Sequence, residues 1–518
     1  MKCHPERGVL QMKYRNPILP GFYPDPSICR VEQDYYMVTS SFEYFPSVPI
    51  FHSRDLVNWE QIGHCLTRES QVPLKGVMPS GGVWAPTIRY HNGLFYMTTT
   101  NVSGNGNFYV TAENPAGEWS DPIWLSIGGI DPSLTFDEDK VYYTVSHPDA
   151  NGSWGIAQAE LDIATGQFLS ELKHIWYGSG GKSPEAPHLY KINDLYYLMI
   201  AEGGTFFTHM ETIARSKTPW GPFESCPRNP ILTNMQAKNL EVHCIGHGDF
   251  VEDHLGNWWI ICHGIRIAQK YMTHIGRETF LAPVSWDESG WPIINNGKWI
   301  ERNSEAPLLP CVPVSAENEV DHFDDSIIGF HWNYLRNPYV QDYDLDYKKG
   351  FITLWGNSYE IHDLDSPTLL CRRQRYYECN IATSFEYQPL HENEEAGLVI
   401  FITGEFHYKV VKKKLNGRYV LALEKRADDF FQVAAMVEVK EGTLFIKVEA
   451  DRLKYHFYYG YAEDEKIFLS SASTRFLACE VVGRGFTGTY VGMYASGKGK
   501  KSTAPASFDY FMLKNQEE

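Results

Sequence analysis

Three acidic residues occupy similar short motifs that lie far apart in the chain. Asp25 lies in YPDPS, Asp131 in GGIDPSL and Glu185 in SPEAPHLY, so a proline follows each acid within two residues. Proline fixes its own φ and restricts the residue before it, which constrains the backbone at each acid. A single motif of this kind is typical of a turn. Three of them suggest carboxyl groups that are held for a common purpose.

Paired carboxyl groups can hydrolyse glycosidic bonds. One carboxylic acid protonates the departing oxygen, and one carboxylate activates a water molecule. When the two groups stand about 6.5–9.5 Å apart, the water fits between them and the sugar configuration is inverted. A third carboxylate near the acid raises the pKa of that acid by like-charge repulsion. This chemistry requires a fold that brings the three acids together.

A five-fold repeat in the first 300 residues predicts such a fold. Its units begin at Asp25, Ala85, Asp131, Ala186 and Gly248. Each unit has a small or acidic residue, a short apolar segment, a polar turn and then a pair of large residues, which is typical of a β-hairpin. A second polar turn that ends at an aromatic residue follows each hairpin. Five such units without helices between them predict a five-bladed β-propeller.

In a propeller the innermost strands lie along one axis, so equivalent positions of the repeat converge. Asp25, Trp84, Asp131, Glu185 and His247 stand at the starts of the five units. Trp84, Glu185 and His247 precede the aligned start by one place, and the two aspartates fall on it. A purely structural turn would favour one residue type in all five units. The variety instead predicts one funnel lined by three carboxyl groups, a tryptophan and a histidine.

The C-terminal part of the chain predicts a second all-β domain. Residues 305–320, EAPLLPCVPVSAENEV, are rich in proline and lack periodicity, which is typical of a linker. The segments beyond alternate between apolar and polar residues, as in a sandwich of two sheets. We therefore predict a propeller over residues 1–305, a linker over 306–320 and a β-sandwich over 321–518. The sandwich shows no acid pair of its own, so it is a structural or sugar-binding module.

The composition excludes several partners. A net charge of −18 argues against nucleic acid and anionic membranes, because phosphate contacts need clustered Lys and Arg. We find no signal-peptide core and no run of 18 apolar residues. Ten cysteines without a CxxC pair favour free thiols in a reducing cytoplasm. We expect a cytoplasmic homo-oligomer that meets a small, imported substrate.

Several motifs resemble those of glycoside hydrolase family 43, and the likeness extends through nearly the whole chain. The closest likeness is to the intracellular β-xylosidases and α-L-arabinofuranosidases of that family, whose five-bladed propeller agrees with the repeat. The resemblance implies that Asp25 is the general base, Glu185 the general acid and Asp131 the residue that tunes and orients the acid. The motifs are NPILPGFYPDPSI, SSFEYFPSVPIFHSRDLVNW, GGVWAP, GGIDPSL, SPEAPHLY, AEGGT, GHGDFVED and GRET.

The same resemblance implies the substrate pocket. Phe42 and Trp84 would form its walls, and Arg277 would contact sugar hydroxyls. His247 would lie on the axis beside the base, where some relatives hold a calcium ion, although no cofactor is required for catalysis. By the GRGFTGTYVG motif, Phe486 of the sandwich would close the pocket. A funnel closed at one end admits only terminal sugars, which predicts exo action.

We therefore predict an inverting exo-glycosidase that releases terminal xylose from short β-1,4-xylooligosaccharides, with α-L-arabinofuranosyl groups as a second substrate. One alternative is an enzyme that is mainly an α-L-arabinofuranosidase. A non-catalytic carbohydrate-binding propeller is disfavoured, because binding alone needs no acid–base pair. A metal-dependent hydrolase is disfavoured too: His243 and His247 are four residues apart, but this segment is loop and strand rather than one helical face.

Overall fold

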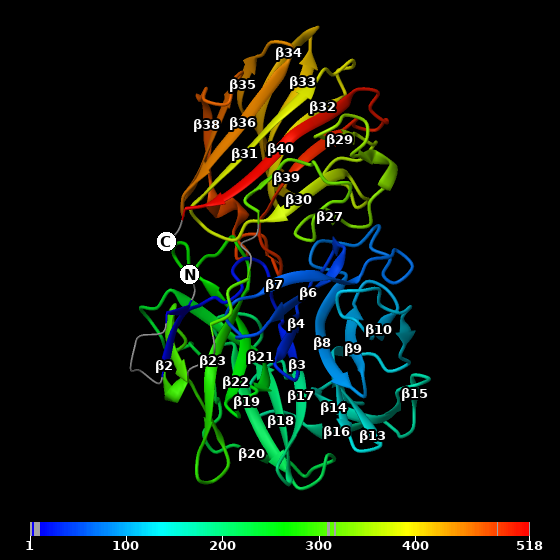
Figure 1. Cartoon of the computed structure of the whole chain (residues 1–518), viewed down its shortest axis with the longest axis vertical. Helices are drawn as coiled ribbons and strands as arrows, with labels where there is room; N and C mark the ends of the chain where they lie inside the picture. The colour runs from blue at the N-terminus through cyan, green and yellow to red at the C-terminus, as the bar shows by residue number, and fades with distance from the viewer. Residues whose placement is uncertain (1–2, 5–10, 308–310, 315–317, 484, 517–518) are drawn as a thin grey trace.

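The computed structural model describes residues 3–4, 11–307, 311–314, 318–483 and 485–516. This part of the chain is all β, apart from three short 3-10 turns: η1 (Asn295–Gly297), η2 (Val340–Asp342) and η3 (Thr474–Leu477). Figure 1 shows two bodies, with the N-terminal strands below and the strands from β27 onward above. The predicted fold class, a five-bladed β-propeller followed by a β-sandwich, is confirmed.

Each blade is an antiparallel sheet whose neighbouring strands follow chain order, except that the last strand of blade 3 pairs with its third strand. Blades 1 and 2 contain β3 (Ser27–Val31), β4 (Asp34–Val38), β6 (Ser47–Ser53), β7 (Glu60–Leu66), β8 (Val83–His91), β9 (Leu94–Asn101), β10 (Gly106–Ala112) and β11 (Ile123–Trp124). Blade 3 contains β12 (Ile130–Asp137), β13 (Lys140–Pro148), β14 (Trp154–Asp162), β15 (Gln167–Phe168) and β16 (Lys173–Trp176). Blades 4 and 5 contain β17 (Glu185–Ile192), β18 (Leu195–Glu202), β19 (Met210–Ser216), β20 (Glu224–Ser225), β21 (Val242–Glu252), β22 (Trp258–Arg266), β23 (Glu278–Trp286) and β24 (Pro292–Ile294).

The start of every blade carries one residue in the left-handed backbone region. These residues are Asp25, Ala85, Asp131, Ala186 and His247, with φ of 55°, 38°, 56°, 52° and 53°. In β8, β12, β17 and β21 the pairing register shifts at this point, as in a β-bulge. A bulge re-aims side chains, and strained backbone of this kind gathers at functional sites.

The bulge corrects one part of the predicted alignment. His247 has the same backbone geometry as Asp25 and Asp131, so it falls on the aligned start of its unit rather than one place before it. Gly248 stands where the other units have proline. The predicted alignment instead placed Gly248 at the start of the fifth unit, as the small residue expected there, and was therefore displaced by one residue.

A buried ion pair ties the inner strands together below the funnel. Asp249 accepts hydrogen bonds from Arg89 Nη1 at 2.8 Å, Ser27 Oγ at 2.6 Å and Tyr190 Oη at 2.7 Å. Arg89 Nη2 also donates to His188 Nδ1 at 2.9 Å. These residues come from blades 1, 2, 4 and 5, so one carboxylate fixes the relative position of four blades.

The two ends of the propeller meet beside blade 5. The strand β2 (Gln11–Arg15) pairs with β1 (Cys3–His4) and with β25 (Asn303–Pro307). The side-chain amide of Asn16 donates to the Leu281 carbonyl and accepts from the Leu281 N–H, both at 2.9 Å. The ring is thus closed by contacts between segments that are more than 260 residues apart.

The C-terminal domain consists of two sheets that face each other across a shared apolar core. One sheet contains β26 (Val320–Asp321), β28 (Tyr343–Asp344), β29 (Ile352–Trp355), β31 (Cys379–Tyr387), β36 (Thr443–Ala450), β37 (Lys454–Gly460), β38 (Ile467–Ser473) and β40 (Pro505–Asn515). The other contains β5 (Tyr44–Phe45), β27 (Asn333–Leu335), β30 (Thr368–Arg373), β32 (Glu395–Thr403), β33 (Phe406–Leu415), β34 (Arg418–Ala427), β35 (Phe430–Glu438) and β39 (Tyr490–Ser496). In the predicted linker 306–320, residues 308–310 and 315–317 lie outside the described part of the chain.

The strand β5 joins the two domains, because it comes from blade 1 but extends a sheet of the sandwich. Tyr44 and Phe45 pair with Leu335 and Tyr334 of β27. The Tyr44 ring stacks on Tyr490 at a centroid distance of 3.9 Å. The sandwich is therefore held at the end of the propeller where Phe42 lies.

Two further expectations concern cysteines and membranes. Of the cysteines that the structure describes, eight are free thiols, as the sequence predicts. Cys311 is not among these eight, because it is disulfide-bonded, and it departs from the predicted free thiols. Within the described chain we find no helix with the length and apolar character that a membrane crossing requires.

Candidate active site

Asp25 is held by polar groups from blades 1 and 5. Its Oδ1 accepts from Arg277 Nη1 at 2.6 Å and lies 3.0 Å from His263 Nδ1, while His247 Nδ1 stands 3.5 Å away. Its Oδ2 accepts from Ser40 Oγ at 2.6 Å. Burial raises the pKa of Asp25, but the positive charge of Arg277, together with the neighbouring His247 and His263, holds it well below its usual range. Asp25 is therefore a carboxylate at neutral pH.

The other two acids are shifted in the opposite direction. Burial, and next the charges of Asp131 and Asp25, raise the pKa of Glu185 to about 8. The pKa of Asp131 is raised to about 6, chiefly by burial. His247 lowers this pKa and the charge of Asp25 raises it. Asp131 Oδ2 also accepts from the Ala186 N–H at 3.1 Å, which ties blade 3 to the residue after Glu185. At neutral pH Glu185 is thus protonated while Asp25 is ionised.

Three aromatic rings from both domains form one cluster, and two of them lie beside Arg277. The centroids of Phe42, Trp84 and Phe486 are 5.6–6.3 Å apart. The Arg277 guanidinium lies 5.7 Å from the Phe42 ring and 5.8 Å from the Phe486 ring. The Phe486 N–H donates to Ser80 Oγ at 3.2 Å, so the sandwich loop is fixed to the propeller. All the predicted site residues thus meet in one place, since Arg277 connects the rings to Asp25.

Comparison with known proteins identifies this arrangement. Residues 14–292 match the family described as "Glycosyl hydrolases family 43", and residues 320–514 match the "Beta xylosidase C-terminal Concanavalin A-like domain". The chain belongs to glycoside hydrolase family 43. It is therefore a glycoside hydrolase, as the motifs predicted.

Several family 43 relatives match over almost their full length. A non-reducing end α-L-arabinofuranosidase of Bacteroides ovatus is 43% identical, over 97% of this chain and 95% of that protein. A xylosidase/arabinosidase of Butyrivibrio fibrisolvens is 39% identical, over 96% of this chain and 98% of that protein. The crystal structure of a xylan β-1,4-xylosidase from Bacillus halodurans superimposes with a TM-score of 0.93 at 36% identity, over 97% of this chain and 100% of that one.

Two residues around the base of this family 43 site were missed by the sequence reasoning. His263 contacts Asp25 from β22, and Ser40 donates to Asp25 while it accepts the Ala85 N–H at 2.7 Å. His263 could have been found as a histidine that follows the apolar run WWIIC, because a fully buried polar side chain needs a partner. Ser40 carries no such signal, since a serine after a strand is common.

Asp25, His247 and His263 offer three ligand atoms within 4.8 Å of one another. This group does not by itself fit calcium, which takes six to eight oxygen ligands. It supplies one carboxylate and two imidazoles, and the carboxylate already accepts from the Arg277 cation. The calcium ion that some relatives hold beside His247 therefore stays an untested expectation for this chain.

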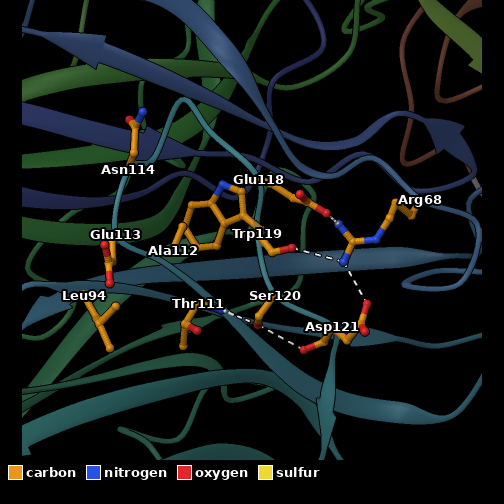
Figure 2. Close-up of a pocket in the computed structure, with 10 residues that line it drawn as sticks. All are labelled: Arg68, Leu94, Thr111, Ala112, Glu113, Asn114, Glu118, Trp119, Ser120 and Asp121. Atoms are coloured by element: carbon orange, nitrogen blue, oxygen red, sulfur yellow. Dashed lines mark hydrogen bonds and ion pairs between the residues drawn. The ribbon is translucent and has the colours of Figure 1, made fainter.

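A separate cavity of about 630 Å³ lies at the outer edge of blade 2. Figure 2 shows Arg68 bonded to its neighbours on one side of the cavity, while Glu113 and Asn114 stand apart from that group. Arg68 contacts Glu118 at 2.7 Å, Asp121 at 2.8 Å and the Trp119 carbonyl at 3.1 Å. We therefore assign no chemistry to this cavity.

Proposed function

We propose that this glycoside hydrolase is an inverting exo-glycosidase that removes terminal xylose from short β-1,4-xylooligosaccharides. The observation that carries the proposal is the opposite displacement of two pKa values in one funnel. Asp25 is ionised and Glu185 is protonated over the same neutral range. Two carboxyl groups whose environments separate their pKa values in this way supply the base and the acid of a glycosidase.

In the proposed mechanism Asp25 removes a proton from water, and that water attacks the anomeric carbon. Glu185 donates its proton to the glycosidic oxygen as the bond to the leaving sugar breaks. Asp131 keeps Glu185 protonated through its charge, and its bond to Ala186 N fixes the backbone beside the acid. Arg277 and Ser40 hold one oxygen each of the Asp25 carboxylate, which orients the base. No step of this mechanism uses a metal ion.

Exo action is supported by the aromatic wall. Phe42, Trp84 and Phe486 contact one another beside the guanidinium that binds Asp25. Because Phe486 comes from the sandwich, the second domain restricts the funnel beside the base. A pocket that is closed in this way accommodates a terminal sugar ring but not the middle of a chain.

A second candidate is an enzyme that acts mainly on α-L-arabinofuranosyl groups. It is favoured by the 43% identity to a protein named as a non-reducing end α-L-arabinofuranosidase. The Butyrivibrio relative is named for both sugars. β-D-xylopyranosyl and α-L-arabinofuranosyl groups present similar shapes, so one pocket can accept either.

The proposal is tested with a panel of nitrophenyl glycosides and proton NMR of the first sugar released. We expect hydrolysis of the β-xyloside or the α-L-arabinofuranoside, with inverted anomeric configuration. Retention of configuration would exclude Asp25 as a base that activates water. Sugar binding without hydrolysis would favour a non-catalytic propeller. We expect activity to survive a chelator; a loss that calcium restores would assign Asp25, His247 and His263 to a metal site.

We also propose that the enzyme works as a homo-oligomer in the cytoplasm on imported oligosaccharides. A large acidic chain of this kind commonly forms a symmetric assembly. Analytical ultracentrifugation of the purified chain tests the assembly, and fractionation of cells that produce it tests the location. A monomer, or export from the cell, would contradict the respective part of the proposal.

A further inference from the structure

Two loops lie side by side at the end of blade 4 that carries Glu185. Residues 178–183 lead into β17, and residues 203–208 follow β18. The Gly203 N–H donates to the Lys182 carbonyl at 2.6 Å, and a Cβ placed on Gly204 would lie 4.0 Å from Ser183 Oγ. We call these two segments the blade 4 lip. Ser183 is two residues before Glu185, so the lip adjoins the proposed acid.

One buried carboxylate holds the first segment of the lip. Glu202 is fully buried and accepts from Ser179 N at 2.9 Å, Ser179 Oγ at 2.8 Å and Gly181 N at 2.7 Å. Thr212 Oγ1 donates to the same carboxylate at 2.5 Å. A Cβ at Gly178 or Gly181 would lie 2.6–2.8 Å from Glu202 atoms, so glycine is required there. The segment is thus wrapped around a side chain that does not itself reach the surface.

The second segment of the lip is held from blade 5. The Phe207 ring contacts the His243 ring at 5.3 Å and the Tyr271 ring at 5.5 Å. The adjacent Phe206 remains 62% exposed, although it is one of the largest apolar side chains in the chain. Phe206 is therefore held toward solvent by a backbone that its neighbour Phe207 fixes against blade 5.

The exposed groups of the lip suit a sugar. Phe206 offers a flat apolar face, and the exposed Lys182 and Ser183 offer an ammonium and a hydroxyl group beside it. A sugar ring has an apolar face of C–H groups and a rim of hydroxyls. Binding sites combine apolar contact with a few polar groups that set the orientation.

The position relative to Glu185 indicates which sugar the lip would bind. The acid must contact the oxygen between the terminal sugar and the leaving sugar. Because the aromatic wall of Phe42, Trp84 and Phe486 stands beside Asp25, the leaving sugar lies on the Glu185 side. We propose that the blade 4 lip binds the leaving-group sugar, with Phe206 as its stacking surface and Glu202 as the residue that positions it. This inference rests on the proposed function.

The test measures the binding of xylobiose and of xylose by calorimetry in the full-length Glu185→Gln protein, with arabinofuranosyl-xylose and arabinose in parallel. Xylobiose reaches the lip, whereas xylose fills only the closed pocket. We expect Phe206→Ala to weaken the binding of xylobiose roughly tenfold and to change the affinity for xylose by no more than about twofold. The control is Phe430→Ala, which removes a similarly exposed ring from the sandwich strand β35. It should change the affinity for neither sugar.

Unchanged disaccharide binding, or equal weakening of disaccharide and monosaccharide, would overturn the inference. If the Glu185→Gln protein bound none of the four sugars, the proposed function itself would fail. Glu202→Ala should weaken disaccharide binding as strongly as Phe206→Ala does. Glu202→Gln keeps one acceptor oxygen and should weaken that binding less. If Glu202 only supported the fold, the binding of the disaccharide and of the monosaccharide would weaken together, and the positioning role of Glu202 would be wrong.

Discussion

The substitution Asp131→Asn tests whether Asp131 keeps the proposed acid protonated. Asparagine has nearly the same shape and retains an oxygen for the Ala186 N–H, so the backbone beside Glu185 should stay in place. The negative charge is lost. Because the pKa of Asp131 is about 6 and that of Glu185 about 8, Asp131 is already ionised when Glu185 loses its proton. Removing the charge must therefore lower the pKa of Glu185.

The size of the effect follows from the order of the causes. The pKa of Glu185 rises from 4.5 to about 8, and burial, the largest cause, survives the substitution. Asp131 is the second cause, and Asp25 and Arg277 act in opposite directions. We therefore expect the pKa of Glu185 to fall by about one pH unit, which corresponds to roughly 1.4 kcal/mol.

The assay is the pH dependence of kcat/KM, which reports the ionisation of the free enzyme. For the unaltered enzyme we expect activity to decline as the pH rises through about 8, since Glu185 then loses its proton. For Asp131→Asn the decline should move to about pH 7. Asp137→Asn is the matched control, because Asp137 ends the same strand but pairs with Lys191 and Tyr196. An alkaline limit that stays in place, or moves upward, in Asp131→Asn would refute the reasoning.

Further predictions concern the acids, the pocket and the propeller. Asp25→Asn and Glu185→Gln should each lower turnover of a nitrophenyl glycoside by at least the ~10²–10⁴-fold typical of general acid–base groups. A more activated leaving group should partly rescue only Glu185→Gln, and equal behaviour of the two variants would contradict the assigned roles. Phe486→Ala should lower kcat/KM for xylobiose about tenfold, and an unchanged value would disprove its place in the pocket. Arg89→Met should lower the free energy of unfolding in urea by about 3–5 kcal/mol, because it leaves Asp249 charged and buried; a loss below about 1 kcal/mol would show that the pair is not needed.

Much of the fold was predictable because the sequence of the propeller repeats once for each blade. Each blade must bury the same faces of the same strands, so the apolar pattern recurs and reveals the architecture. The alignment failed at His247 because Gly248 replaces the proline that marks the other units. A backbone torsion, rather than a residue type, shows that His247 belongs with Asp25 and Asp131.

The amino-acid sequence by itself predicted the blades, the three acids and Trp84, because these follow a repeated local pattern, whereas Phe42 and Phe486 of the pocket wall were implied only by the family resemblance. The protonation states of the acids were decided only by the tertiary structure. Asp25 and Glu185 are both buried carboxyl groups, and nothing in YPDPS or SPEAPHLY tells one from the other. The difference arises because Arg277, 252 residues from Asp25 along the chain, places its charge on that acid, whereas Glu185 faces Asp131. Electrostatic interactions depend on distance in space, so only the closed ring of blades separates base from acid.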